Sequence, residues 1–150
     1  MPGLYYEEFD IGMEFHHPLT RTVTEMDNVM FCAMTHNPQP LHLDEEYAKK
    51  TFYGQRIVNS LFTLGLVIGI TVADTTLGTT LGNLGMTDIR FKNPVHHGDT
   101  IHVITRIKDM RESKSRPESG IVTFEHLGYN QNDEEIAYCL RVGLMKIKGS

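Results

Sequence analysis

The chain has 150 residues, the usual size of one folded domain, and 40% of them are hydrophobic, which is ordinary for a protein that buries a full core. Its formal net charge of −5 argues against nucleic acid or an anionic membrane surface as the main partner. The two cysteines, Cys32 and Cys139, stand in apolar contexts and indicate buried thiols in a reducing, cytoplasmic compartment.

The first elements of the chain are a strand and a short helix. Residues 14–23 predict a strand that ends at Thr24. Thr24, with Asp27 three residues later, is typical of a capped helix start. We therefore expect a short helix over residues 27–33. The side chains that should face inward from it are Val29, Met30 and Ala33.

The next segment is rich in proline, which predicts a rigid turn rather than a helix or a strand. The turn carries the carboxamide of Asn37 and the imidazole of His42, and Asp44 can then cap a second short helix over residues 44–50. A stiff loop that holds a histidine and a polar partner suits proton transfer on a small substrate. Plainer interpretations stay open, in which His42 only bonds to backbone and Asn37 forms an Asx turn before Pro38.

The longest helical pattern covers residues 57–72 and leaves almost no polar face, which predicts a buried helix. Asn59 and Ser60 stand at its start. There they can cap the helix, present backbone N–H groups to a ligand, or do both. The apolar stretch over residues 61–73 is too short to span a bilayer.

From Leu81 onward the hydrophobic period changes to two, which is typical of strands. Four strands are expected, separated by turn signals, over residues 84–91, 101–107, 121–129 and 136–147. The order of one strand, short helices, a buried helix and four strands predicts an α+β fold. We expect a single domain over residues 1–150, with an antiparallel sheet wrapped around the helix as in the hot-dog fold.

Several motifs resemble those of MaoC-like enoyl-CoA hydratases and dehydratases. Pro40-Leu41-His42, with Asp44 and Ala48, matches the end of the family's Gly-Asp-x-Asn-Pro-Leu-His signature. Phe91-Lys92-Asn93-Pro94-Val95 and Gly98-Asp99-Thr100 match its Phe-x-x-Pro-Val and Gly-Asp-Thr motifs. Within this family, the closest resemblance is to the branch acting on mesaconyl-CoA, β-methylmalyl-CoA or itaconyl-CoA. The segments that carry it are Asn37-Pro38-Gln39-Pro40-Leu41-His42, Val58-Asn59-Ser60-Leu61, Arg111-Glu112-Ser113-Lys114-Ser115-Arg116-Pro117 and Gly120-Ile121-Val122-Thr123-Phe124-Glu125.

Four positions depart from the family pattern. Asn37 stands where the family has its catalytic Asp, Gln39 stands where it has Asn, and Asn59-Ser60 replaces a common His-Gly pair. A carboxamide can orient water but cannot exchange a proton near neutral pH. Either His42 therefore handles both proton transfers through one water, or another acid such as Asp44 or Glu45 assists.

The resemblance implies a cytoplasmic hydro-lyase that adds water reversibly to a 2-enoyl-CoA thioester. It implies no cofactor beyond the coenzyme A of the substrate, no metal, and a homodimer or larger homo-oligomer with the acyl pocket at the subunit interface. His42 would be the base and Asn37 would hold the water. The expected oxyanion and substrate-binding residues are Asn59, Ser60, Gln39 and Arg56.

A dicarboxylic substrate also needs a cation for its free carboxylate. Arg56 is the nearest by sequence, and the other candidates are Arg111, Lys114 and Arg116. These cations could bind the CoA phosphates instead, and residues 111–119 could be only a solvated hairpin loop. Alternative functions are a general (R)-specific enoyl-CoA hydratase, a thioesterase on the same fold and a non-catalytic acyl-CoA-binding module. The absence of an acid over residues 57–73 counts against the thioesterase.

Overall fold

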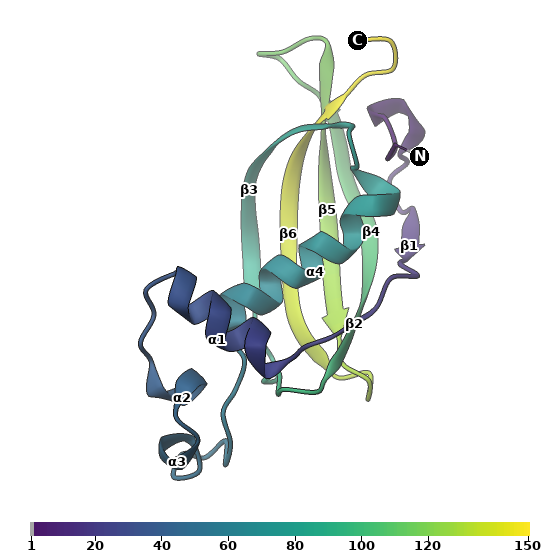
Figure 1. Ribbon diagram of the computed structural model, residues 1–150. Coiled ribbons are helices and arrows are strands. Elements are labelled where there is room, and N and C mark those ends of the chain that lie inside the picture. The colour runs from purple at the N-terminus through teal and green to yellow at the C-terminus, as the bar shows by residue number, and fades with distance from the viewer. Residues whose placement is uncertain (1) are drawn as a thin grey trace.

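A computed structural model describes residues 2–150, in which one antiparallel sheet is crossed by a long helix (Figure 1). The strands are β1 (Glu14–His16), β2 (Arg21–Thr22), β3 (Thr80–Arg90), β4 (Thr100–Glu112), β5 (Ser119–Tyr129) and β6 (Glu135–Lys146). The helices are the 3-10 turn η1 (Tyr6–Glu8), α1 (Glu25–Met34), α2 (Pro40–Leu43), α3 (Glu45–Ala48) and α4 (Ser60–Thr75). The strand order is β1-β4-β5-β6-β3, with β2 also paired to β4. The predicted α+β class is confirmed.

The core lies between α4 and the inner face of the sheet. Ile101, Val103, Thr105 and Ile107 of β4 are all buried, as their alternation predicted. Val67 of α4 packs in the same cluster as Val103 and Ile136. A Cβ added at Gly128 would lie 2.6 Å from Val67, so the helix can approach β5 only over a glycine.

Helix α4 is not buried all round, which corrects the prediction from its apolar sequence. It packs on β4, β5 and β6, and the side chains that it buries include Leu64, Val67 and Ile70. On the opposite side, Leu61 is 62% exposed and Gly65 is exposed as well. The apolar sequence therefore covers a second face that this chain leaves open.

The orientation predicted for α1 is also wrong. Thr24 caps this helix in a capping box with Asp27, as expected, but Val29 and Met30 are 39% and 53% exposed, and Ala33 is exposed too. The inward face is formed by Asn28 and Cys32, which are one turn apart. The polar Asn28 meets hydrogen-bonding groups there, so its burial outweighs the apolar pattern.

Two proline-dependent predictions need correction. The expected strand over residues 14–23 is divided into β1 and β2, and Pro18, which has no N–H for a sheet bond, stands between them. The predicted turn contains a single helical turn, α2, with Pro40 at its first position, where the missing N–H is not needed. Asp44 caps the following α3, as predicted, by accepting a hydrogen bond from Tyr47 N at 3.1 Å.

A buried chain of polar side chains crosses the inner face of the sheet. Arg141 Nε donates to His126 Nε2 at 3.0 Å, and His126 Nδ1 lies 2.9 Å from Thr105 Oγ1. Thr105 Oγ1 lies 2.7 Å from His17 Nε2, and His17 Nδ1 lies 2.7 Å from Asp74 Oδ1 near the end of α4. Because an arginine can only donate, each hydrogen bond in this series is donated in the direction from Arg141 toward Asp74.

No helix within residues 2–150 is both long enough and apolar enough to cross a lipid bilayer. Helix α4, at 16 residues, is the longest of those described.

Candidate active site

Asn28 joins four segments at the N-terminal end of α4. Its side-chain nitrogen donates to Ile57 O at 3.1 Å and lies within 3.0 Å of His97 Nε2 and 3.3 Å of His42 O. Its side-chain oxygen accepts from Asn59 N at 2.9 Å. The residue is fully buried, so one carboxamide fixes the positions of α1, α2 and the start of α4 relative to one another.

His42 lies in α2 with one ring nitrogen held by backbone. Its Nδ1 is 2.8 Å from Ile57 O, and a carbonyl oxygen only accepts, so Nδ1 carries the proton in the neutral ring. The other nitrogen, Nε2, then has a free lone pair. Within residues 2–150 it forms no hydrogen bond. The backbone bond expected in the plainer interpretation is present, and it sets the tautomer that a general base requires.

Asn37 precedes α2 and forms an Asx turn, as the alternative interpretation expected. Its Oδ1 accepts from Gln39 N at 3.0 Å. Its side-chain nitrogen has no hydrogen-bond partner in the described part of the chain. The preceding residue, His36, has a left-handed φ of 57°, which is uncommon for a residue with a Cβ and recurs at functional sites. Asn37 can therefore donate to a water oxygen while its own oxygen shapes the turn.

The N-terminus of α4 has two kinds of backbone N–H. Those of Asn59 and Leu61 are already bonded, to Asn28 Oδ1 and Asn59 Oδ1, both at 2.9 Å. The side chain of Asn59 thus caps the helix. Among the residues that the structure describes, the N–H groups of Ser60 and Phe62 have no acceptor. They remain available to a ligand oxygen at the positive end of the helix dipole.

His97 is a member of this cluster that the sequence analysis did not single out. Burial lowers the pKa of His97 below its usual value, and the positive charge of Arg56 adds to this effect. Its ring is therefore neutral at pH 7, and its Nε2 can accept from Asn28. The sequence signals that were available were the polar Asn28 inside a short helix, where Asn is disfavoured, and the His96-His97 pair.

Arg56 lies close to this cluster but is already paired with two carboxylates. Its Nε donates to Glu45 at 3.0 Å and a terminal nitrogen donates to Glu25 at 3.1 Å. Its backbone N–H also donates to Glu45 at 3.3 Å. Arg56 therefore connects α1 and α3, and its role as a substrate-binding cation stays a prediction.

The other three candidate cations are far from His42. Arg111, Lys114 and Arg116 are exposed on the hairpin between β4 and β5, which lies at the opposite end of the sheet from α2 and α3 (Figure 1). Their expected role in binding CoA or a carboxylate also stays a prediction.

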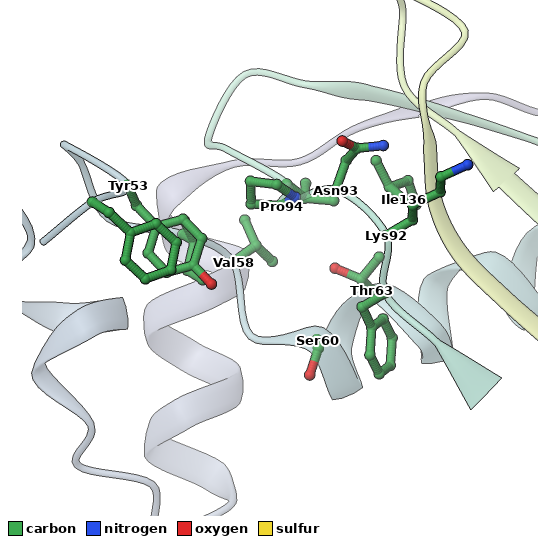
Figure 2. Close-up of a pocket in the computed structure, with 12 residues that line it drawn as sticks. Tyr53, Val58, Ser60, Thr63, Lys92, Asn93, Pro94 and Ile136 are labelled. Atoms are coloured by element: carbon green, nitrogen blue, oxygen red, sulfur yellow. The ribbon is translucent and has the colours of Figure 1, made fainter.

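Two pockets flank the start of α4. The first, of about 410 Å³, is lined by polar groups of Tyr53, Ser60 and Thr63 and by Lys92 (Figure 2). The second, of about 400 Å³, has mostly apolar walls and lies beside Asn37. Its lining residues are Val29, Cys32, Ala33, His36, Asn37, Pro38 and Leu43. Asn59, which precedes Ser60, donates from its side chain to Cys32 Sγ of the second pocket at 3.7 Å.

A comparison with protein families gives a match to the MaoC like domain over residues 8–130. The chain belongs to this family. The match includes the α1–α2 segment, the start of α4 and strands β1 to β5, so the cluster around Asn28 lies inside the MaoC-like domain.

Two curated proteins and one solved structure show how far the similarity extends. This MaoC-like chain is 29% identical over 140 residues to β-methylmalyl-CoA dehydratase from Chloroflexus aurantiacus, with 93% of the chain and 39% of that protein covered. It is 30% identical over 117 residues to 3-hydroxybutyryl-CoA dehydratase from Methylorubrum extorquens, with 75% and 69% covered. The chain thus spans about two fifths of the first relative's length.

The solved structure confirms the fold. A Mycobacterium tuberculosis protein described as having a double hot-dog fold superposes with a TM-score of 0.88 over 99% of this chain and 46% of that one. The sequence identity is 16%, so this likeness shows the fold alone. The MaoC-like chain therefore has the predicted hot-dog fold, in which the sheet wraps around α4 (Figure 1).

Proposed function

We propose that this chain is an acyl-CoA hydratase/dehydratase that adds water reversibly to the double bond of a 2-enoyl-CoA thioester. The observation that carries the proposal is His42, whose Nδ1 is held 2.8 Å from Ile57 O while Nε2 is unpartnered in the described chain. Membership of the MaoC-like family and the dehydratase names of two relatives support it.

In hydration, water attacks C3 and loses a proton, and C2 gains one. His42 Nε2 takes the proton from water, since a neutral imidazole suits that task near pH 7. The imidazolium that forms then returns the proton toward C2. Asn37 donates from its side-chain nitrogen to the same water and exchanges no proton. One base thus serves both transfers, and the reverse sequence removes water.

Negative charge develops on the thioester oxygen during the addition. The N–H groups of Ser60 and Phe62 are the two at the start of α4 without an acceptor within residues 2–150, so they are the proposed donors. The side chain of Asn59 holds the helix end by capping it. Removing one such donor typically costs about 3–4 kcal/mol of transition-state stabilisation.

The proposed substrate is a short, branched dicarboxylic acyl-CoA of the mesaconyl-CoA or itaconyl-CoA type. The similarity to β-methylmalyl-CoA dehydratase supports this choice. The similarity to 3-hydroxybutyryl-CoA dehydratase favours the second candidate, a general enoyl-CoA hydratase acting on short monocarboxylic substrates.

A homodimer is the proposed working form. Strand β3 is the last in the sheet, and its outer edge has no partner strand in the described chain. Its exposed apolar side chains include Leu81 and Leu84, at 49% and 54%, and the open face of α4 adds Leu61 at 62%. An unpaired edge of 11 residues beside exposed apolar groups favours pairing with a second copy.

Dimerisation can be tested by sedimentation velocity. Leu84→Arg on β3 should yield monomers, because it places a charge among the apolar groups of the proposed interface. Leu19→Arg is the matched control, since Leu19 is similarly exposed, at 52%, but lies between β1 and β2. A monomeric wild-type protein at micromolar concentration would contradict the proposal.

The proposed activity is tested by following the enoyl-thioester absorbance of mesaconyl-CoA, itaconyl-CoA and crotonyl-CoA in parallel. Loss of absorbance with any of them, reversed by the hydrated product, is the expected result. Preference for a dicarboxylic substrate would support the finer assignment, and preference for crotonyl-CoA would support the general hydratase. If a folded protein changes the absorbance of none of the three substrates, the proposed hydratase activity is overturned.

Thioesterase activity is measured in the same reactions as release of free thiol. Helix α4 extends beyond the expected range and includes one acid, Asp74, but its carboxylate is bonded to His17 at the end away from Ser60. We therefore expect no thiol release. Binding without turnover would instead indicate a non-catalytic acyl-CoA-binding module.

A further inference from the structure

The pocket beside Ser60 contains one cation and no anion. Its lining residues are Phe52, Tyr53, Ile57, Val58, Ser60, Thr63, Phe91, Lys92, Asn93, Pro94, Val95 and Ile136. Lys92 is the one basic residue of this set, and the set holds no Asp or Glu. The pocket beside Asn37 has no Lys or Arg in its lining. Of the two pockets at the start of α4, only the first therefore suits an anionic group.

Lys92 is free to bind such a group. In the part of the chain that the structure describes, its ammonium forms no hydrogen bond and no ion pair. Arg56, by contrast, is held by Glu25 and Glu45. Asn93, which follows Lys92 in the sequence, is fixed by a hydrogen bond from its side-chain nitrogen to Glu135 O at 2.8 Å. The backbone next to Lys92 is thus anchored while its charge is unused.

Figure 2 shows how the polar groups are arranged around this pocket. The hydroxyls of Tyr53 and Ser60 lie on one side, and Lys92 extends past Ile136 on the side away from Tyr53. The ring of Tyr53 packs at a tilt of 32° against Phe52, with ring centroids 4.2 Å apart, and the two rings form an aromatic wall. The pocket therefore offers an acyl group largely apolar walls, with Lys92 as the one cation among its lining residues.

We propose that Lys92 binds the free carboxylate of a dicarboxylic acyl-CoA and so determines substrate specificity. This inference rests on the proposed function. Ser60, whose N–H is a proposed thioester donor, lines the same pocket as Lys92. The free carboxylate of mesaconyl-CoA is a few bonds from its thioester, whereas the CoA phosphates lie beyond the whole pantetheine arm. Sharing one pocket with the thioester therefore favours the carboxylate over the phosphates.

The test compares Lys92→Met with wild type on mesaconyl-CoA and crotonyl-CoA. A charge-assisted bond to a carboxylate corresponds to about a 10- to 100-fold change in affinity. We expect kcat/KM for mesaconyl-CoA to fall by that factor, mainly through KM, and kcat/KM for crotonyl-CoA to stay within about twofold. Lys92→Arg should restore part of the loss. Lys108→Met is the control, since Lys108 is also exposed and unpaired within residues 2–150 but lies on β4.

A binding arm separates this inference from the proposed activity. Methylsuccinyl-CoA and butyryl-CoA have no double bond, so their affinities can be measured by calorimetry whether or not the protein turns over an enoyl thioester. Lys92→Met should lower the affinity for methylsuccinyl-CoA by the same factor and leave the affinity for butyryl-CoA unchanged. The same affinities can be measured with the corresponding pantetheine esters, which lack the CoA phosphates. If Lys92→Met lowers the affinity for both CoA esters equally but does not lower it for the pantetheine esters, Lys92 binds the phosphates and the inference is overturned. No weakening of either ester would overturn it too.

Discussion

The two ends of α4 hold histidines in opposite states. Near its C-terminal end, His17 and His126 have both ring nitrogens bonded, in the chain that connects Arg141 to Asp74. Near its N-terminal end, His42 has only Nδ1 bonded. A fully bonded, buried imidazole holds structure together, whereas one with a free lone pair can exchange a proton. This difference explains why His42, and not His17 or His126, is the proposed base.

The largest expected effect is on catalysis at the N-terminal end. His42→Ala should lower kcat by about 10²- to 10⁴-fold, because a positioned general base contributes a factor of that size. The free energy of unfolding should change by only about 1 kcal/mol, the value of one hydrogen bond. Turnover measurements and urea unfolding on the same samples check both expectations. Near-wild-type turnover would remove His42 from the mechanism.

The second effect is on stability at the C-terminal end. His126→Leu removes the acceptor of Arg141 Nε and leaves a buried guanidinium with less bonding than it has now, since Arg141 already has one unpartnered terminal nitrogen among the described residues. Removing one partner of a buried charged contact lowers the free energy of unfolding by about 3–5 kcal/mol. Urea unfolding measures the loss, and the activity per folded molecule should be unchanged. His16→Ala, on an exposed histidine, is the control and should cost less than about 0.5 kcal/mol.

The third prediction concerns Asn28, which belongs to the N-terminal cluster but carries no chemistry itself. Asn28→Ala leaves Asn59 N without its acceptor and frees His97, so we expect a loss of about 1–3 kcal/mol in stability. Because the same bonds position the start of α4 and the segment at Ile57, kcat should also fall. A variant with lower stability but full kcat would show that the cluster does not position the site.

The fourth prediction is a dependence of stability on pH. Burial, and then the positive charge of Arg141, hold the pKa of His126 well below its usual value of 6.5. The unfolded chain therefore binds a proton below about pH 6.5 that the folded chain does not bind, so stability should fall as the pH decreases from 7 to 5. The slope for one such group approaches about 1.4 kcal/mol per pH unit.

Denaturant midpoints measured from pH 5 to pH 8 test this slope. His126→Gln should make the dependence shallower, because a carboxamide has no proton to gain. The pKa of His97 is also lowered, mainly by burial, so part of the slope should remain. An unchanged slope in His126→Gln would place the acid sensitivity elsewhere.

The smallest effect is expected at the helix cap on α1. Thr24 accepts from Asp27 N at 3.2 Å, and Asp27 accepts in turn from Thr24 N at 2.8 Å. Thr24→Ala should cost about 1 kcal/mol in thermal or urea unfolding. Because Asn28 still holds the inner face of α1, kcat should not change. A fall in kcat would show that the start of α1 contributes to the site.

The amino-acid sequence alone determined the order of the main elements, the hot-dog layout, the cap of α1 and the segment that carries His42 and Asn37. These follow from local patterns: hydrophobic period, capping residues and proline positions act within a few residues of chain. The same local patterns failed where a face had no partner in this chain, so the apolar residues of α1 and α4 were expected inside although one side of each helix is exposed.

Only the tertiary structure decided which groups are chemically available. The free nitrogen of His42 depends on Ile57, 15 residues away, and the Asn28 cluster depends on His97, 69 residues away. The state of each candidate cation depends in the same way on distant groups: Arg56 is paired with Glu25, 31 residues away, while Lys92 is free in the described chain. Such contacts join segments brought together by packing, and no short-range pattern encodes them.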